Sequence, residues 1–181
     1  MTKIIIFGAN GQLGKEMSIK LTAKPEVTLF PLTKKDCDIR NLVSMESKIK
    51  NIKPDYVINC AAYTKVDDAE NNRIIANEIN HFAAENLSII SKSLDFTLIH
   101  FSTDYVYESS GNKPIKEEDK KKPINYYART KLAGDEKIIK NCKKYYIFRI
   151  GWVYGKYGNN FPKKILDAAK TQKELNVVND Q

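Results

Sequence analysis

The stretch "KIIIFGANGQLGKEM", residues 3–17, decides the fold of this chain. An apolar, β-branched run ends at Gly8, and a helical pattern begins at about Gln12. Gly8, Gly11 and Gly14 lie at this junction with the spacing G-x-x-G-x-x-G. In a strand–turn–helix unit such glycines allow a tight turn, close approach of the backbone to a diphosphate, and close packing of the helix on the sheet. The stretch therefore predicts a dinucleotide site at the N-terminus of the first helix.

The rest of the chain alternates between apolar runs and helical patterns. We expect strands over residues 3–8, 27–30, 56–62, 96–102, 145–153 and 175–178, and helices over 12–23, 41–52, 67–92, 125–140 and 160–172. Continuous β-branched runs between helices are typical of a parallel sheet covered on both faces. The sequence predicts an α/β fold, a Rossmann-like doubly wound parallel sheet in three layers (α/β/α), with residues 1–181 as one dinucleotide-binding domain. Since the sequence ends on a strand pattern, we expect a C-terminal substrate-binding part to be missing.

Composition narrows the class of protein. Of the 181 residues, 42% are hydrophobic and 29% are charged, which is ordinary for a soluble globular protein. No apolar run approaches the roughly 20 residues needed to cross a bilayer, and "MTKIIIFG" lacks the regions of a signal peptide. The cysteines, three in number and far apart, suit neither a disulfide framework nor a zinc site. We expect a cytoplasmic protein without a membrane partner.

The net charge of +8 does not indicate a nucleic-acid partner. The lysines are spread along the chain, and the densest run, "KEEDKKK" at 116–122, is mixed in sign. A strand-binding groove would instead need arginines interleaved with aromatic residues. The histidines, His81 and His100, lack metal-ligand spacing, and His100 lies in an apolar run as a core histidine would. The sequence offers no metal-ligand cluster, although Mg²⁺ stays possible as a cofactor.

A second stretch, "YYARTKLAGDE" at 126–136, carries a candidate catalytic pair. Lys131 follows Tyr127 by four residues, so the two side chains share a helix face, whereas Tyr126 does not share it. An ammonium group near Tyr127 is expected to lower its pKa from about 10. Such a phenol can protonate a carbonyl oxygen while a nicotinamide delivers hydride, and Lys131 can also hold the ribose hydroxyls. The Y-x-x-x-K spacing is common on helix surfaces and does not indicate catalysis by itself. It indicates a catalytic pair only together with the glycine loop and the strand that ends in Ser–Thr–Asp upstream.

The run "FSTDYVY", residues 101–107, ends the fourth predicted strand. Ligands bind beyond the carboxyl ends of parallel strands. Thr103 is placed to hydrogen-bond the reacting carbonyl and Tyr127, and Asp104 can accept hydrogen bonds from sugar hydroxyls. A strand-end turn with side-chain capping over Ser102–Asp104 stays open as the alternative.

The second strand lacks the acidic residue that usually binds the adenosine ribose. The segment "LFPLTKKD", residues 29–36, has prolyl, threonyl and lysyl residues at that place. Nothing there repels a 2′-phosphate, so either NADPH or NADH is expected, with NADPH favoured.

With these pieces together, the chain resembles the extended short-chain dehydrogenase/reductases, and within them the dTDP-4-dehydrorhamnose reductases. The matching stretches are "FGANGQLGKE", "KPDYVINCAAYTKVDDAE", "HFSTDYVY", "PINYYARTKLAGDE", "FRIGWVYGKYGNNF" and "LNVVNDQ". Ala128 departs from the glycine that many relatives carry, and the family continues well beyond "NDQ".

The resemblance implies NAD(P)H-dependent reduction of the 4-keto group of dTDP-4-dehydro-L-rhamnose to dTDP-L-rhamnose. It implies Tyr127 as proton donor, assisted by Lys131 and Thr103. It implies substrate contacts at Thr103, Asp104 and Trp152. The cofactor contacts that we expect are at Gly8, Asn10, Gly11, Gln12, Leu13, Gly14, Asp38, Ile39, Ala61, Ala62, Tyr63, Thr64, Tyr127 and Lys131.

Several alternatives stay open. Another nucleotide-sugar epimerase or reductase would share these features, whereas a dehydratase is disfavoured because Tyr105 stands where an extra carboxylate is needed. A non-catalytic dinucleotide-binding subunit, of the kind that regulates methionine adenosyltransferase, resembles the same reductases. A homodimer also stays open, because some relatives use a glutamate at the place of Glu16 for magnesium-linked dimerisation, although a surface glutamate explains Glu16 equally well.

Overall fold

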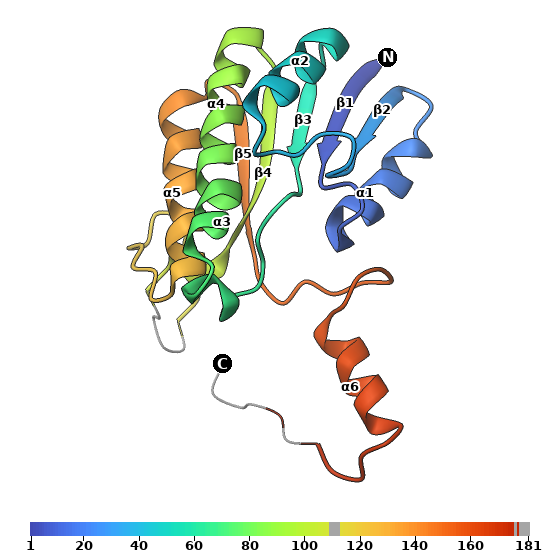
Figure 1. Cartoon of the computed structure of the whole chain (residues 1–181), viewed down its shortest axis with the longest axis vertical. Coiled ribbons are helices and arrows are strands. Elements are labelled where there is room, and N and C mark those ends of the chain that lie inside the picture. The colour runs from blue at the N-terminus through green and yellow to red at the C-terminus, as the bar shows by residue number, and fades with distance from the viewer. Residues whose placement is uncertain (109–112, 176, 178–181) are drawn as a thin grey trace.

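A computed structural model describes residues 1–108, 113–175 and 177. It contains a five-stranded parallel sheet in the order β2-β1-β3-β4-β5 (Figure 1). The strands are β1 (Thr2–Phe7), β2 (Val27–Leu32), β3 (Tyr56–Asn59), β4 (Thr97–Thr103) and β5 (Tyr145–Ile150). The helices are α1 (Gln12–Thr22), α2 (Leu42–Ile52), α3 (Arg73–Asn77), α4 (Ala83–Leu94), α5 (Tyr126–Asn141) and α6 (Phe161–Ala169).

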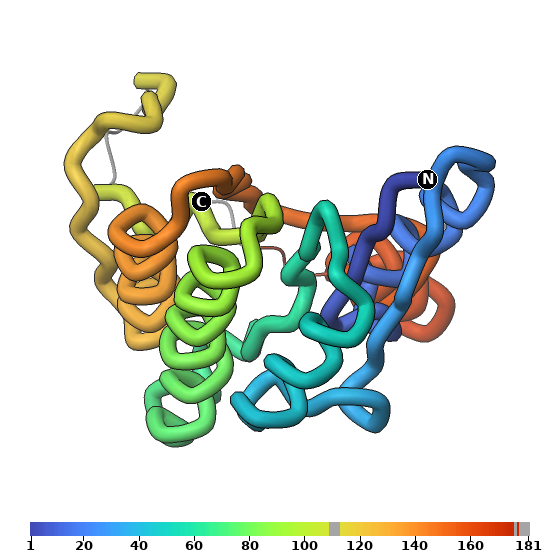
Figure 2. Tube along the Cα trace, turned by 90° about the horizontal axis from the view of Figure 1, so that it is seen from above, coloured from blue at the N-terminus to red at the C-terminus, as the bar shows by residue number. Residues whose placement is uncertain are grey.

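Helices cover both faces of the sheet, which confirms the doubly wound α/β prediction. Side chains of β1 alternate: Ile5 and Phe7 join a core with α2, α4 and α5, whereas Ile4 and Ile6 join a second core with α1. Figures 1 and 2 show α4 and α5 side by side on one face of the sheet. The strand order reverses between β1 and β3, so a crevice is expected at the carboxyl ends of these strands.

Two strands are shorter than predicted. We expected a strand over 56–62, but β3 ends at Asn59, whose side-chain oxygen accepts a hydrogen bond from the main-chain N–H of Ala61 at 3.1 Å. This local bond takes the place of a ladder bond to a neighbouring strand. We expected another strand over 145–153, but β5 ends at Ile150 because Trp152 adopts a left-handed conformation, φ 51°, that a strand cannot hold.

The long amphipathic segment predicted over 67–92 is not one regular α-helix. A 3₁₀ turn (Asp68–Glu70) and α3 are followed by a π-helical turn (Glu78–Phe82) and then α4. The π-helical turn contains Asn80, whose side chain bonds the main chain of Tyr63 in both directions and donates to Thr130. Periodicity cannot reveal such a turn, because the side-chain bonds of Asn80 that accompany it are to segments distant in sequence.

The sixth strand, predicted over 175–178, lies in part outside the described residues; Leu175 and Val177, which are described, are not in a strand. The helix predicted over 160–172 is α6, capped by the Asn160 side chain. Within the described ranges, every helix is too short or too polar to cross a membrane.

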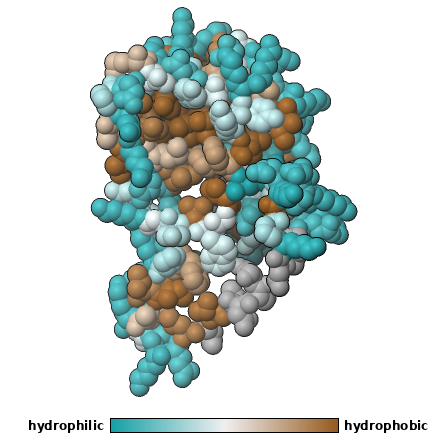
Figure 3. Space-filling model, turned by 180° about the vertical axis from the view of Figure 1, so that it is seen from behind, coloured by the Kyte–Doolittle hydropathy of each residue, from teal (hydrophilic) through white to brown (hydrophobic). Residues whose placement is uncertain are grey.

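Part of the sheet face that carries α1 is exposed over β5. Tyr146 and Phe148 are 58% and 48% exposed, and Phe148 stacks on Phe101 with ring centroids 5.7 Å apart. Figure 3 shows apolar side chains gathered on the upper half of the molecule's back. Helix α1 therefore covers only a portion of this face.

Candidate active site

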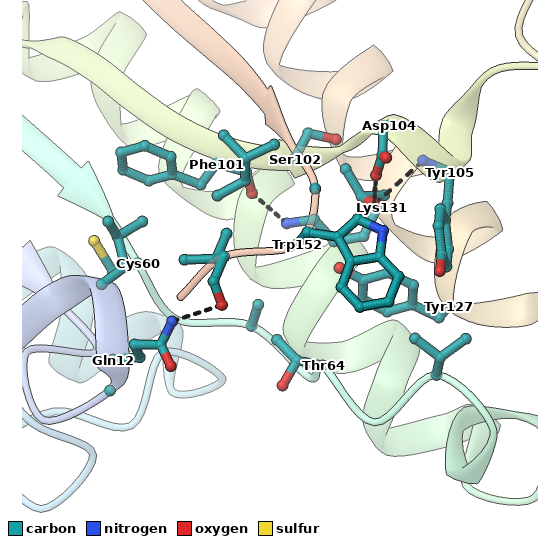
Figure 4. Close-up of a pocket in the computed structure, with 18 of the residues that line it drawn as sticks. Gln12, Cys60, Thr64, Phe101, Ser102, Asp104, Tyr105, Tyr127, Lys131 and Trp152 are labelled. Atoms are coloured by element: carbon teal, nitrogen blue, oxygen red, sulfur yellow. Dashed lines mark hydrogen bonds between the residues drawn. The ribbon is translucent and has the colours of Figure 1, made fainter. Parts of the chain in front are cut away.

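A cavity of about 510 Å³ lies at the carboxyl edge of the sheet (Figure 4). It is enclosed by the start of α1, the ends of β3 and β4, the first turns of α5, and the segment after β5. The structure thus brings together residues that are far apart in the chain: the side-chain amide of Gln12 donates to the Val153 carbonyl, 141 positions away, at 2.9 Å. The predicted site residues that line this cavity are Gly11, Gln12, Leu13, Ala62, Thr64, Thr103, Asp104, Tyr127, Lys131 and Trp152.

A second cavity, of about 220 Å³, adjoins the first. The two share Gly11, Cys60 and Ala62 in their walls. The predicted cofactor residues that line the second cavity are Gly8, Asn10, Gly11, Asp38, Ile39, Ala61 and Ala62. The two cavities therefore lie next to each other at the edge of the sheet.

Two predicted cofactor residues, Gly14 and Tyr63, line neither cavity. A Cβ atom on Gly14 would stand 2.3 Å from the carbonyl oxygen of Gly8, so this glycine serves the packing of α1 on the loop. The hydroxyl of Tyr63 donates to Asp68, and its main-chain N–H donates to Asn80 at 2.9 Å. Both residues therefore support the residues that line the site, without lining a cavity themselves.

The glycine loop leaves the N-terminus of α1 open. Gly8 has φ 74°, and a Cβ there would stand 2.7 Å from the main-chain nitrogen of Ala61. Gly11 occupies the N-cap position and offers no side-chain cap, and the first turn of α1 has no acidic residue. The free N–H groups and the positive end of the helix dipole make this place suitable for an anion.

Helix α5 presents Tyr127 to the cavity. The helix begins directly after Asn125, whose side chain accepts a hydrogen bond from the N–H of Ala128 at 2.8 Å. Tyr127 is half-buried in the cavity wall. Tyr126 is outside it: its main-chain N–H donates to Glu70, and the Arg73 guanidinium lies over its ring at 5.0 Å. The geometry therefore separates the adjacent tyrosines as the helical spacing predicts.

The pKa of Tyr127 differs from our prediction. Burial raises the pKa of this phenol, and the carboxylate of Asp104 raises it further, while a hydrogen bond with Thr103 acts in the opposite direction. The predicted lowering by Lys131 is wrong for this structure, because the Lys131 amine is turned toward the main-chain carbonyl of Phe101, at 2.6 Å. Figure 4 shows this contact beneath the cavity.

Lys131 itself is almost fully buried, with 1% of its surface exposed. Burial lowers its pKa to about 8, and the negative charge of Asp135 opposes this shift. A lysine of this kind changes protonation close to physiological pH, as residues at functional sites often do.

The strand-end residues combine the two roles that the sequence left open. The hydroxyl of Thr103 donates to Asp104 at 3.1 Å and accepts from the N–H of Tyr105 at 3.3 Å, so it caps the 3₁₀ turn Asp104–Val106 while lining the cavity. Trp152 is 55% exposed at the cavity rim, and its ring forms a T-shaped pair with that of Phe161, the ring centroids being 5.2 Å apart.

Part of the site lies below Lys131. The sequence predicted His100 as a core histidine, which its 1% exposure confirms, but it did not predict the contact with Lys131. His100 and Asp135 are buried there, and the Lys131 amine is 3.2 Å from Nε2 of His100. A signal existed: Tyr127, Lys131 and Asp135 recur every four residues on α5. The prediction also passed over Cys60 and Tyr105, which line the larger cavity.

The described residues contain no group of three or more metal-ligating side chains. Glu16 accepts a hydrogen bond from the main-chain N–H of Lys156 at 3.1 Å. Its contact is therefore within the chain.

Comparison with known proteins identifies the family. A profile of the RmlD substrate binding domain matches residues 1–181. The dTDP-4-dehydrorhamnose reductase of Escherichia coli (strain K12) is 38% identical over 180 residues, which are 98% of this chain and 60% of that protein. This chain therefore spans about 60% of the length of the curated relatives that it matches.

Solved structures agree with the fold. The dTDP-4-dehydrorhamnose reductase of Bacillus anthracis, in complex with NADP, is 40% identical with a TM-score of 0.93, covering 97% of this chain and 62% of that one. The reductase of Clostridium acetobutylicum is also 40% identical, with a TM-score of 0.95, covering 99% and 64%. The predicted Rossmann-like fold is confirmed, and the chain belongs to the RmlD substrate binding domain family.

Proposed function

We propose that residues 1–181 form the dinucleotide-binding domain of an NAD(P)H-dependent reductase. Its reaction is reduction of the 4-keto group of dTDP-4-dehydro-L-rhamnose to dTDP-L-rhamnose. The observation that carries this proposal is the meeting of Tyr127, Lys131 and Thr103 in one cavity with the open N-terminus of α1. The relatives named dTDP-4-dehydrorhamnose reductase, one of them in complex with NADP, support it.

The residues present fit a nicotinamide dinucleotide. The uncapped first turn of α1 suits the diphosphate, because its N–H groups are free of side-chain partners. The smaller cavity, with Asp38 and Ile39 in its wall, suits the adenosine half. Tyr127 and Lys131, in the wall of the larger cavity, would then hold the nicotinamide half.

When bound, the reduced nicotinamide supplies a hydride to the carbonyl carbon of the sugar. Tyr127 donates its phenolic proton to the carbonyl oxygen, so that one C–H and one O–H bond replace the C=O π bond. Thr103 holds the phenol and the carbonyl in line. Lys131, whose amine lies against the Phe101 carbonyl in the cavity wall, would assist by holding the ribose hydroxyls of the cofactor. A proton from solvent restores the phenol. The burial that raises the pKa of Tyr127 keeps it protonated before the step.

The rim of the larger cavity suits the sugar. The Asp104 carboxylate can accept hydrogen bonds from sugar hydroxyls, and the half-exposed Trp152 offers an apolar face to the pyranose ring. Both residues follow strands β4 and β5, at the edge where ligands of open α/β sheets bind.

We place the enzyme in the cytoplasm, because the thiols of Cys37, Cys60 and Cys142 are all free.

The test is an assay of the whole protein with NADPH and dTDP-4-dehydro-L-rhamnose, followed by the absorbance of the reduced nicotinamide. We expect oxidation of NADPH only when the keto sugar is present. A protein that binds NADPH, leaves the keto sugar unreduced and is captured by a methionine adenosyltransferase would instead be a regulatory subunit. This outcome would overturn the reductase proposal.

A further inference from the structure

The segment after β5, residues 151–160, lies across the start of α1. Figure 1 shows it leaving the sheet at the end of β5 and passing α1 before it reaches α6. Gly151, Trp152 and Val153, at its beginning, line the larger cavity. Trp152 has a left-handed backbone, φ 51°, which is uncommon for a bulky residue and persists only where the surroundings hold it. The contacts of this segment therefore determine where Trp152 stands.

Two amide side chains connect the segment to α1. The Gln12 amide nitrogen donates to the Val153 carbonyl at 2.9 Å (Figure 4), and the Gln12 oxygen accepts from the Asn160 amide nitrogen at 3.2 Å. The Asn160 nitrogen also donates to the Gly155 carbonyl at 3.0 Å. The main chain passes close to Gln12, since a Cβ on Gly158 would stand 2.8 Å from the Cβ of Gln12. We call Gln12 and Asn160 the amide clamp.

The orientation of both amides follows from their partners. The main-chain N–H of Lys163 can only donate, and it donates to the side-chain oxygen of Asn160 at 3.3 Å. The Asn160 nitrogen therefore faces Gln12 and the Gly155 carbonyl, which both accept. The Gln12 oxygen in turn faces Asn160, which leaves the Gln12 nitrogen for the Val153 carbonyl. Every bond of the amide clamp thus requires the same orientation of the two amides.

Asn160 makes more contacts than a helix cap needs. Its oxygen caps α6, a role that a serine fills about as well. Its nitrogen adds the bonds to Gln12 and Gly155, and the residue is buried, with 6% of its surface exposed. Removal of this nitrogen would leave acceptors of the clamp without their donor, which costs free energy where water does not replace it. The additional bonds therefore connect the glycine loop to the segment of Trp152.

We propose that Asn160 is a positioning residue for the reaction: through Gln12 it holds residues 151–155 beside the larger cavity, so that Trp152 is in place for the sugar. This inference rests on the proposed reductase function. Asn160 lines neither cavity, so it acts through residues that do. Because Gln12 is the first residue of α1, where the diphosphate is expected, the amide clamp also fixes Trp152 relative to the cofactor.

The test follows Trp152 directly, in the whole protein labelled with fluorotryptophan. The ¹⁹F signal of Trp152 is identified by its loss in Trp152→Phe. Asn160→Ser keeps a cap for α6 but is too short to reach Gln12, so the signal should move toward its position in the urea-unfolded protein. The matched control is Asn41→Ser, the same change at the N-cap of α2, where the side chain accepts from Ser44 at 3.0 Å. The control should leave the signal in place.

Kinetics separate positioning from a general loss of structure. In Asn160→Ser, KM for the keto sugar should rise about three- to ten-fold, which corresponds to the net contribution of one hydrogen bond, while kcat changes less. The affinity for NADPH, measured by fluorescence titration, should stay close to the unmodified value, because the main-chain N–H groups of α1 are unchanged. Partial unfolding would instead lower kcat and leave KM unaltered, since only the number of active molecules would fall.

The position of the Trp152 signal decides the inference. An unmoved signal in Asn160→Ser overturns it, and so does a lower kcat with an unaltered KM for the keto sugar. If Asn160→Ser does not fold, Gln12→Met, which keeps the length of the side chain and removes both bonds, should move the signal in the same direction; an unmoved signal there overturns the inference as well. The ¹⁹F measurement needs no turnover, so an absence of NADPH oxidation in the unmodified protein would separately refute the reductase function.

Discussion

At the scale of single residues, the two tyrosines at the start of α5 show how one position decides a role. Tyr127 faces the larger cavity, whereas Tyr126 is held by Glu70 and Arg73 on the outside. Helical spacing from Lys131 predicts this difference. The direction of the Tyr127 pKa was not predictable, because it depends on burial and on Asp104, which lies elsewhere in the sequence.

The first prediction concerns these hydroxyls. In the whole protein, Tyr127→Phe should reduce kcat by about 10²–10⁴-fold, because a positioned proton donor contributes that much. The affinity for NADPH, measured by fluorescence titration, should stay close to the unmodified value. Tyr126→Phe is the matched control and should turn over almost normally. Near-normal turnover by Tyr127→Phe would show that another group supplies the proton.

The second prediction concerns the choice of cofactor. Lys34 lines the smaller cavity, 3.9 Å from Asp38, and its side chain is 69% exposed. Lys34→Glu should weaken NADPH binding about five-fold, equivalent to about 1 kcal/mol for an exposed charge pair, with little effect on NADH. Lys35→Glu makes the same charge change at an exposed neighbour that lies outside the cavity wall and is the control. Equal weakening by the two variants in a fluorescence titration would contradict a specific contact with the 2′-phosphate.

At the scale of elements, the contact between α5 and the π-helical turn determines how the site is supported. Gly134 of α5 lies against Asn80, and a Cβ there would stand 2.3 Å from the Asn80 carbonyl oxygen. Asn80 in turn bonds Thr130 of α5 and the main chain of Tyr63. This contact connects the helix of Tyr127 and Lys131 to the loop after β3.

The third prediction tests that contact. Gly134→Ala should lower the free energy of unfolding by about 1–3 kcal/mol, because the added methyl group meets main-chain atoms that cannot yield. In an ordinary helix interior the same change would stabilise by about 1 kcal/mol, so the sign is informative. Urea denaturation followed by circular dichroism measures it. Glu136→Ala, at an exposed position of the same helix, should be almost neutral; a stabilised Gly134→Ala would mean that the helices are further apart than described.

At the scale of the whole molecule, the burial of Lys131 links folding to pH. The folded protein releases this proton at about pH 8, whereas an unfolded lysine holds it to about pH 10.4. Between these values the unfolded chain binds more protons than the folded chain, so stability gains as pH rises. Below pH 8 both states are protonated, and the cost of burying the charge is constant.

The fourth prediction follows from this linkage. The free energy of unfolding of the unmodified protein, minus that of Lys131→Met, should increase by about 2 kcal/mol between pH 7 and pH 10, which is the size expected for a buried lysine with this shift. Subtraction removes the titration of all other groups that the two proteins share. Urea denaturation at a series of pH values gives both curves. A difference that stays flat or falls would show that the lysine is more hydrated than its 1% exposure indicates.

The sequence by itself determined the alternation of strands and helices, the loop of Gly8, Gly11 and Gly14, and the shared face of Tyr127 and Lys131. These features are local: β-branched runs, glycine spacing and helical periodicity act over a few neighbouring residues. They were enough to predict the doubly wound sheet, which the structure confirms.

Only the tertiary structure decided the ends of β3 and β5, the π-helical turn at Asn80, and the polar side chains that are buried around Lys131. The turn at Asn80 and the residues around Lys131 depend on bonds between segments far apart in the chain, such as Ser102 with Asp135, 33 positions away. The two strands end through local geometry, the Asn59–Ala61 hydrogen bond and the left-handed Trp152, which the hydrophobic pattern does not reveal. Burial then sets the pKa of Tyr127 and Lys131, because the cost of a charge depends on what surrounds it in space rather than in sequence.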